Sequence, residues 1–445
     1  MIPKGMILSQ SQEIQGSIKI NRVSYPITHC GGVFTPPGDK SISHRVLLLA
    51  SLSQGTSCLS GFLKSEDCLH TLEALKACGV SIKRENTTVW IEGTGRLRSP
   101  PTSLYFGNAG TGLRLFTGLL AGAGCSAHLI GDVSLHKRPM ERLLLPLRCM
   151  GARIEDTAGK APLTVLSAPL KPLSFNLPVA SSQVKTALLL AGLASRQPIR
   201  LMGRIDTRDH LERLCQHWGI PLQRSLQCLD YQPEPGHFQA HDFVIPGDIS
   251  SAAFFIALVA GWKGMTLKVE SVGLNPHRIG FLRVLQRMGA NVQWILTETV
   301  PEPLGSVEVR GVELTGVTVP TLWVPDCIDE FPALCVAAAM AHGVTHIQGA
   351  EELRWKESDR LVTLTEGLQQ VGIHSVARKD GLSIWGGKPS GGQVDSQGDH
   401  RIAMAFLCLG ARSEEPITVT GCDSISTSFP DFMSIGRILG LSIGD

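Results

Sequence analysis

The sequence predicts an α/β protein of two domains, each built from three similar units of helices and strands. Three observations lead to this fold class. The chain has 445 residues, more than one hydrophobic core usually serves. One helix-to-strand pattern recurs six times, and a Pro-Gly-Asp motif occurs at residues 37–39 and again at 246–248.

The recurring pattern predicts six helix ends. A Leu or Ile is followed after two or three residues by an apolar residue and a glycine, and a β-favouring segment such as Ala290–Ile295 comes next. Glycine suits the left-handed position that closes a helix. The intervals of about 70 residues fit units of two helices and several strands, not a solenoid. The glycines are Gly79, Gly151, Gly219, Gly289, Gly372 and Gly440.

The two Pro-Gly-Asp motifs predict where the chain crosses between domains. If it crosses at both, one domain is discontinuous and carries both termini. We therefore expect a domain of residues 1–36 and 247–445, and an inserted domain of residues 37–246, with the active site in the cleft between them.

Composition narrows the function classes. The 41 Lys and Arg against 39 Asp and Glu give a net charge of +2, which offers no case for nucleic acid or an anionic membrane. The 12 cysteines form no C-x-x-C pair, which suits reduced thiols. Residues 1–20 lack the apolar run of a signal peptide, and the apolar stretch 252–262 is too short to span a bilayer. We expect a cytoplasmic protein that binds small acidic molecules.

The first Pro-Gly-Asp motif opens a helix with cations at its start. Apolar residues recur at helical spacing from Ile42 to Leu49, and Lys40, Ser41 and Arg45 lie in the first turns. A helix N-terminus with added positive charge favours phosphate. Asp39 separates Gly from Lys, so this is not a Walker A loop and ATP is not implied. A capped helix with solvated basic residues is the alternative reading.

Three more polar clusters precede helices in the N-terminal half. Each has an ordinary explanation when taken alone: a glycine-rich turn, a solvated basic turn and an N-cap serine. Together they supply amide, hydroxyl and cationic donors. They are the turn 107–114 with Asn108, Gly110 and Arg114, the segment 137–140 with Arg138 before a helix-starting Pro139, and Ser181-Ser182-Gln183 before a helix expected at 187–194.

The C-terminal half adds carboxylates beside cations. Asp326 and Asp329 precede an Ala-rich helix expected at 333–341, and we expect Asp326 to be an ordinary helix-start anion. Residues 352–360 hold six charged side chains in nine positions, and Asp399-His400-Arg401 opens an apolar helix expected at 402–409. Phosphate or carboxylate binding would account for the arginines at 138, 360 and 401 together.

At these motifs the chain resembles the 5-enolpyruvylshikimate-3-phosphate synthase family, over nearly its full length after residue 30. The resemblance implies an inside-out α/β barrel of six βαβαββ units and transfer of the enolpyruvyl group of phosphoenolpyruvate to the 5-hydroxyl of shikimate-3-phosphate, in the pathway to aromatic amino acids. It also implies a monomer with no cofactor and no metal. It rests on the segments 40–45, 108–114, 138–140, 181–183, 329, 356–360 and 399–401.

The resemblance assigns site residues by position. It implies that Asp329 is the base at the hydroxyl, Glu357 the acid at the methylene carbon, and Lys40 a group that stabilises the departing phosphate or shuttles a proton. The implied shikimate-3-phosphate site is Lys40, Ser41, Arg45, Ser181, Ser182, Gln183, Arg208, Asp329 and Lys356. The implied phosphoenolpyruvate site is Lys40, Asn108, Gly110, Arg138, Gln183, Arg360 and Arg401.

Local sequence places the chain in the second bacterial subgroup of the family. It departs from the other subgroup at Leu115, where that subgroup has Pro, and at Thr427, where that subgroup has a Lys that contacts phosphoenolpyruvate. Gly110 stands where tolerant members of the second subgroup carry Ala, so we expect inhibition by glyphosate, which competes with phosphoenolpyruvate in this family.

Two rival functions remain to be separated from this one. The sister transferase that acts on UDP-N-acetylglucosamine carries Lys-Asn in the first loop and a reactive Cys on a mobile loop. This chain has Lys40-Ser41, and no Cys stands between residues 131 and 140. A non-catalytic anion-binding protein on the same fold would be expected to lose a catalytic residue, yet Lys40, Asp329 and Glu357 are all present.

Overall fold

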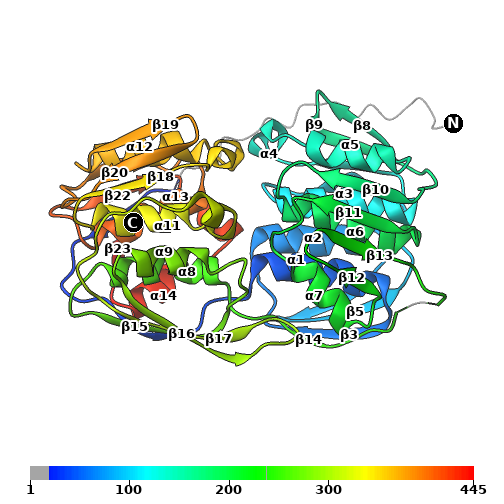
Figure 1. Cartoon of the computed structure of the whole chain (residues 1–445), viewed down its shortest axis with the longest axis horizontal. Helices are drawn as coiled ribbons and strands as arrows, with labels where there is room; N and C mark the ends of the chain where they lie inside the picture. The colour runs from blue at the N-terminus through cyan, green and yellow to red at the C-terminus, as the bar shows by residue number, and fades with distance from the viewer. Residues whose placement is uncertain (1–19, 237) are drawn as a thin grey trace.

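The computed structural model describes residues 20–236 and 238–445, which form two lobes (Figure 1). Each lobe has its own hydrophobic core. One core draws on residues from Ile42 to Ile245, and we call its lobe the insert lobe. The other joins Cys30 and Phe34 to residues from Ile249 to Ile443, and we call its lobe the terminal lobe. The predicted domain boundaries stay a prediction, which these separate cores support.

Three four-stranded sheets belong to the insert lobe. In each sheet the first two strands are parallel and the remaining pairs are antiparallel. Their orders are β14 (Phe243–Val244), β3 (Gln54–Ser60), β5 (Thr88–Thr94), β4 (Ser81–Glu85); β6 (Leu104–Tyr105), β7 (Ala127–Ile130), β9 (Lys160–Leu166), β8 (Arg153–Thr157); and β10 (Leu173–Leu177), β11 (Ile199–Gly203), β13 (Cys228–Tyr231), β12 (Leu222–Arg224).

The terminal lobe holds the other sheets, and one of them has three strands. There an isolated parallel bridge between Thr318 and His346 takes the place of the missing first strand. The orders are β16 (Asn291–Glu298), β17 (Leu304–Arg310), β15 (Thr266–Gly273), β2 (Gly32–Phe34); β18 (Val344–Ile347), β20 (Gly381–Trp385), β19 (Ser375–Arg378); and β21 (Gly392–Asp395), β22 (Ile417–Thr420), β1 (Arg22–Tyr25), β23 (Ser442–Gly444).

Helices connect the strands within each lobe. The insert lobe has α1 (Lys40–Leu52), α2 (Glu66–Ala77), α3 (Gly110–Ala123), α4 (Val133–Lys137), α5 (Glu141–Cys149), α6 (Ser182–Ser195) and α7 (His210–His217). The terminal lobe has α8 (Ile249–Ala260), α9 (Gly280–Arg287), α10 (Val324–Cys327), α11 (Phe331–Ala339), α12 (Arg360–Gln370), α13 (His400–Gly410), α14 (Phe432–Ile438) and the 3₁₀ turns η1 (Thr321–Trp323), η2 (Glu351–Trp355) and η3 (Cys422–Thr427).

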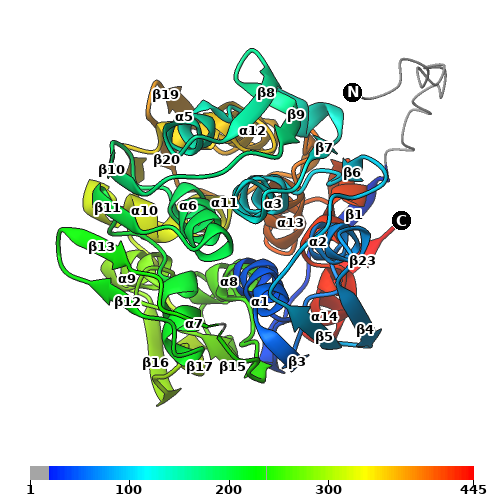
Figure 2. The same ribbon diagram turned by 90° about the vertical axis from the view of Figure 1, so that its right-hand side faces the viewer.

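The insert lobe is built with helices inside and sheets outside. Viewed end-on, α1, α3 and α6 lie in the middle and the strands surround them (Figure 2). Two glycines let α3 and α6 approach closely. A Cβ at Gly118 would lie 2.2 Å from the carbonyl oxygen of Ala187, and one at Gly122 would lie 2.3 Å from that of Ala191. The residues at positions 118 and 122 of α3 therefore have to be small.

All the predicted repeat glycines close helices. Each has a positive φ, between +64° at Gly219 and +100° at Gly440, and a strand follows in every case. Side chains rarely adopt this backbone region, which explains glycine at these positions. The six units predicted from this pattern are thus the six sheet-bearing units of the fold.

Helix boundaries differ locally from those expected. The helices expected at 187–194 and 402–409 begin at Ser182 and His400, because polar residues occupy their first turns. The helix expected at 333–341 runs from Phe331 to Ala339. Pro139 does not start a helix, since α5 begins at Glu141. Across residues 20–236 and 238–445, every helix is too short or too polar to cross a membrane.

The two chain crossings lie side by side between the lobes. Gly38 and Gly247 form an antiparallel bridge, with hydrogen bonds from Asp39 N to the oxygen of Pro246 and from Asp248 N to that of Pro37, at 2.8 and 2.7 Å. Asp39 caps α1 and Asp248 caps α8. The duplicated motif therefore places one helix start in each lobe at the same point.

Candidate active site

A polar cleft lies between the lobes, with about 850 Å³ of space that is open to solvent. First-turn or N-cap residues of several helices line it, from α1, α3 and α6 in the insert lobe and from α8, α12 and α13 in the terminal lobe. The positive ends of these helix dipoles therefore point toward one space. Such a meeting of helix N-termini favours anions.

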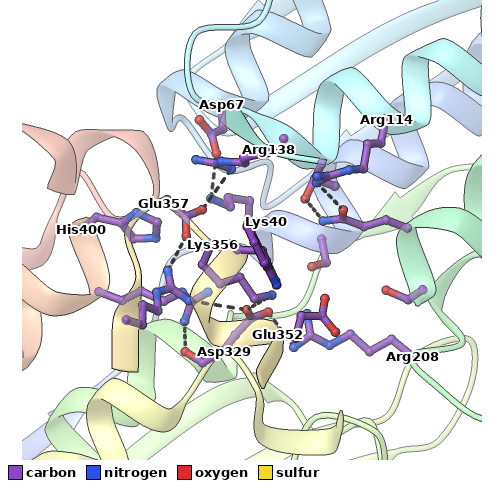
Figure 3. A pocket seen from close by; sticks show the side chains of 18 of the residues that line it. Lys40, Asp67, Arg114, Arg138, Arg208, Asp329, Glu352, Lys356, Glu357 and His400 are labelled. Atoms are coloured by element: carbon purple, nitrogen blue, oxygen red, sulfur yellow. Dashed lines mark hydrogen bonds and ion pairs between the residues drawn. The ribbon is translucent and has the colours of Figure 1, made fainter. Parts of the chain in front are cut away.

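Asp329 lies on the terminal-lobe side of the cleft, between cations from both lobes (Figure 3). Its carboxylate is 2.7 Å from Arg208 Nη2 and 3.2 Å from Lys356 Nζ. Arg401 donates a 2.8 Å hydrogen bond to its backbone oxygen. Burial alone would raise the pKa of Asp329, but Lys356, Arg208 and Arg401 outweigh it and hold the pKa well below the usual range. The carboxylate is therefore ionised when the cleft holds no ligand.

Glu357 is the second carboxylate in a cationic setting. It accepts a 2.6 Å hydrogen bond from Arg360 Nη2 and lies 3.4 Å from Arg138 Nη1 of the opposite lobe. Burial favours the neutral acid, yet Arg360 and Arg138 hold the pKa of Glu357 well below its ordinary value. Arg360 also donates to Asp399, the N-cap of α13, at 2.7 Å. Arg360 thereby links the start of α12 to the start of α13 beside Glu357.

Lys40 forms an ion pair with Asp67, at 2.8 Å, inside the insert lobe. Both side chains are largely buried, and Asp67 comes from the first turn of α2. Burial lowers the pKa of Lys40, but the charge and hydrogen bond of Asp67 more than offset this and raise it. Lys40 is therefore a firmly charged ammonium at the start of α1.

A hydrogen-bonded row spans the helix starts of the insert lobe. Arg114 donates 2.9 Å to Gln183, whose amide nitrogen donates 2.9 Å to Thr111. Arg45 reaches from α1 to Ser182 and Thr186 of α6, at 3.4 and 3.2 Å. Side chains on α1, α3 and α6 thus form one polar wall of the cleft.

The structure brings most of the predicted site residues to the cleft. Those that line it are Lys40, Ser41, Arg45, Gly110, Arg138, Ser182, Gln183, Arg208, Asp329, Lys356, Glu357, Arg360 and Arg401. Ser181 and Asn108 do not line it. Ser181 caps α6 by accepting from Val184 N, and Asn108 accepts from Arg138 while donating to Asp132 at 2.7 Å.

Sequence reasoning missed several cleft residues as site residues. Asp67 lies in the first turn of α2, outside every motif described above. Asp248 belongs to the second Pro-Gly-Asp motif, which predicts only a crossing. Arg278 lies in a loop with no local signal. The other residues that line the cleft are Thr111, Arg114, Arg142, Glu352, Trp355 and His400.

Thr427 stands where the other subgroup has a Lys, and it does not line the cleft. Its hydroxyl donates a 2.7 Å hydrogen bond to the backbone oxygen of Ser424.

The fold and the cleft define a two-lobed α/β protein with a cationic cleft between its lobes. A family model described as EPSP synthase (3-phosphoshikimate 1-carboxyvinyltransferase) matches residues 25–435. A protein of that second name from Methylococcus capsulatus is 45% identical, covering 92% of this chain and 94% of the relative. One from Coxiella burnetii strain RSA 493 is 42% identical, covering 94% and 97%.

Solved structures agree. The EPSP synthase of Acinetobacter baumannii is 38% identical with a TM-score of 0.84, covering 96% of this chain and all of that one. The chain belongs to the EPSP synthase family. The predicted family, enzyme class and fold are confirmed, while the subgroup and the roles of single residues stay predictions.

Proposed function

We propose that this enzyme transfers the enolpyruvyl group of phosphoenolpyruvate to the 5-hydroxyl of shikimate-3-phosphate. One observation carries the proposal. Cations and helix N-termini from both lobes meet around two ionised carboxylates, Asp329 and Glu357, in a single cleft. Such a site can gather anions and move protons, which are the two requirements of this reaction.

The charge of the cleft matches that of the two substrates. Ten Lys and Arg and five Asp and Glu line it, so ten minus five gives a net +5. Two phosphates at about −1.5 to −2 each and two carboxylates bring about −5 to −6. Without this compensation, the two substrates would repel each other at contact distance.

The two substrates would occupy different parts of the cleft, and each would contact both lobes. We assign shikimate-3-phosphate to the wall of α1 and α6 and to Arg208, with Asp329 and Lys356 opposite. Phosphoenolpyruvate then lies toward α3, α12 and α13, where Arg138, Arg360 and Arg401 face the start of α3 at Gly110. In this assignment Lys40 and Gln183 lie between both substrates, and Ser181 and Asn108 act through their neighbours.

Proton transfers balance the chemistry. The 5-hydroxyl oxygen bonds to C2 of phosphoenolpyruvate, its proton passes to Asp329, and C3 takes a proton from Glu357 to become a methyl group. The tetrahedral intermediate then breaks its C2–O bond to phosphate while C3 returns a proton to Glu357. Asp329 gives its proton to the departing phosphate, leaving the enol ether and inorganic phosphate. Lys40 stabilises the departing phosphate.

Substrate binding would prepare Glu357 to act as an acid. In the free enzyme Arg360 and Arg138 hold its pKa low, so it is ionised. A phosphate or carboxylate that recruits these guanidiniums would weaken their pull on Glu357 and raise its pKa. Proton uptake at the acid is thereby coupled to filling the anion sites.

The finer assignments belong to the same proposal. We infer membership of the second bacterial subgroup, a cytoplasmic monomer, and domain boundaries at the two crossings. The 12 cysteines all lie within the described residues and each is a free thiol, which supports a reducing compartment.

Product analysis with two acceptors tests the proposal. The purified protein is incubated with phosphoenolpyruvate and either shikimate-3-phosphate or UDP-N-acetylglucosamine, and products are identified by mass spectrometry. We expect an enolpyruvyl product from shikimate-3-phosphate alone. A product from the nucleotide sugar would assign the sister activity, and no product from either acceptor would favour a binding protein.

A further inference from the structure

The loop between β15 and α9 places one arginine where the two chain crossings meet. Arg278 is 2% exposed, and its guanidinium donates 2.9 Å to Asp39 and 2.9 Å to Asp248. These carboxylates cap α1 of the insert lobe and α8 of the terminal lobe. One side chain thus ties the helix starts of two separate cores.

The same guanidinium reaches two further helix starts. It donates 2.7 Å to Ser250, which donates in turn to Glu330, the residue before α11. On the opposite side it lies 3.4 Å from His210, the first residue of α7, which contacts Glu302 at 2.7 Å. Arg278 is therefore the meeting point of four helix starts, two in each lobe.

Three residues of this network lie one or two positions from a residue assigned to the substrates. Asp39 precedes Lys40, Glu330 follows Asp329, and His210 comes two residues after Arg208. The backbone of Lys40 is also held directly, because its N–H donates to Asp248 at 3.2 Å. Short stretches of capped backbone therefore pass any shift of Arg278 to these three side chains.

The charges make this arrangement hard to replace. Burial disfavours charge on Arg278, but Asp39 and Asp248 outweigh it and raise its pKa. A planar guanidinium can bind two carboxylates at fixed angles, whereas an ammonium is a single point charge. Lysine at this position could therefore keep the charge but not hold both caps.

We propose that Arg278 is a positioning residue that fixes Lys40, Arg208 and Asp329 relative to one another by holding both interlobe crossings. This inference rests on the proposed function. We expect Arg278 to affect the alignment of the reacting groups more than their affinity for substrates. Misalignment by about 1 Å can lower a rate by about a hundredfold.

The test compares Arg278→Lys with Arg412→Lys. Arg412 lies over the Trp262 ring at 4.5 Å in the terminal lobe and does not line the cleft. Calorimetric titration with shikimate-3-phosphate counts competent sites, and kcat per competent site is measured at saturating substrates. For Arg278→Lys we expect about one site per chain, a dissociation constant within about fivefold of wild type and kcat at least tenfold lower. Arg412→Lys should match wild type.

Two outcomes would overturn the proposal. One is a kcat per site within twofold of wild type, and the other is a loss explained wholly by fewer competent sites. If Arg278→Lys does not fold, Asp248→Asn decides, since asparagine still caps a helix but removes one anion from the guanidinium. That variant should also lose kcat per site, and a normal value would refute the inference. A wild-type protein without activity would instead refute the proposed function.

Discussion

Glu357 accepts a 2.6 Å hydrogen bond from Arg360, three residues further along the chain. The same guanidinium binds Asp399, so the acid is attached to the start of α13 as well as to α12. This pair helps to hold the pKa of Glu357 well below its ordinary value, against the effect of burial.

Replacing either proton-transfer carboxylate should remove turnover without removing binding. We expect Glu357→Gln and Asp329→Asn to lower kcat by about 10²- to 10⁴-fold, the range of general acid–base catalysis, while the affinity for shikimate-3-phosphate changes little. Steady-state kinetics and calorimetry check this. Glu366→Gln is the control, because Glu366 is an exposed residue of α12 that does not line the cleft. Near-normal kcat in either main variant would remove that residue from its role.

The neighbouring serines 181 and 182 should differ in their effects. Ser181 caps α6, so Ser181→Ala should cost about 1 kcal/mol of stability with a small effect on binding. Ser182 lines the cleft and accepts from Arg45 at 3.4 Å, so Ser182→Ala should raise KM for shikimate-3-phosphate. Thermal unfolding and kinetics of both variants separate the roles. Equal KM increases would place Ser181 in direct contact with substrate.

The depressed pKa of Glu357 predicts a pH dependence of stability. A carboxyl group whose pKa is lower in the folded state stabilises above its unfolded pKa, near 4.3 for Glu, and loses this contribution as the pH falls toward the folded value. The urea midpoint of wild type should therefore fall, relative to that of Glu357→Gln, below about pH 4.3 and stay parallel above about pH 6. Glu313→Gln is the control at an exposed site. Its urea midpoint should follow that of wild type over the whole pH range. Parallel curves for Glu357→Gln throughout would contradict the pairing.

Gly110 should govern sensitivity to glyphosate. A Cβ there would lie 2.8 Å from Arg138 Nη1 and 3.1 Å from Arg114 Nη1, so Ala must displace these guanidiniums. An inhibitor longer than phosphoenolpyruvate should suffer more than the substrate. We expect an inhibited wild type and a Gly110→Ala variant whose inhibition constant rises more than its KM. Inhibition assays with varied phosphoenolpyruvate measure both, and an insensitive wild type or an equally sensitive variant would refute this.

Gly118 should be required for the packing of α3 on α6. Helix propensity alone predicts that Gly118→Ala stabilises the protein by about 1 kcal/mol. The close approach to the oxygen of Ala187 predicts the opposite, a loss of about 1–3 kcal/mol from overpacking. Thermal unfolding distinguishes the two by sign. A more stable variant would show that the helices separate at little cost.

The sequence predicted the helix ends of the repeat completely, but it predicted the site residues only in part. Gly79 and Gly440 predicted helix ends because the backbone has a positive φ at these positions, which favours glycine. Lys40 and Arg360 were found because helix-start cations beside glycine or acid are local signals. The resemblance assigns both Ser181 and Ser182 to the site, but only Ser182 lines the cleft. Sequence alone does not show which of two adjacent side chains faces it.

The missed residues depend on contacts between distant segments. Arg278 meets Asp39 from 239 positions away, and Asp67 meets Lys40 only because α1 and α2 pack together. Neither residue carries a pattern in its own neighbourhood. Long-range pairing of buried charges is set by the fold, so it becomes visible only once the helices are in place.

The most direct measurement of the central claim is the release of inorganic phosphate. The account predicts steady release when shikimate-3-phosphate and phosphoenolpyruvate are both present, none with shikimate-3-phosphate alone or phosphoenolpyruvate alone, and loss of release in Glu357→Gln. Release from phosphoenolpyruvate without an acceptor, or no release with both substrates present, would contradict the claim that this cleft joins the two.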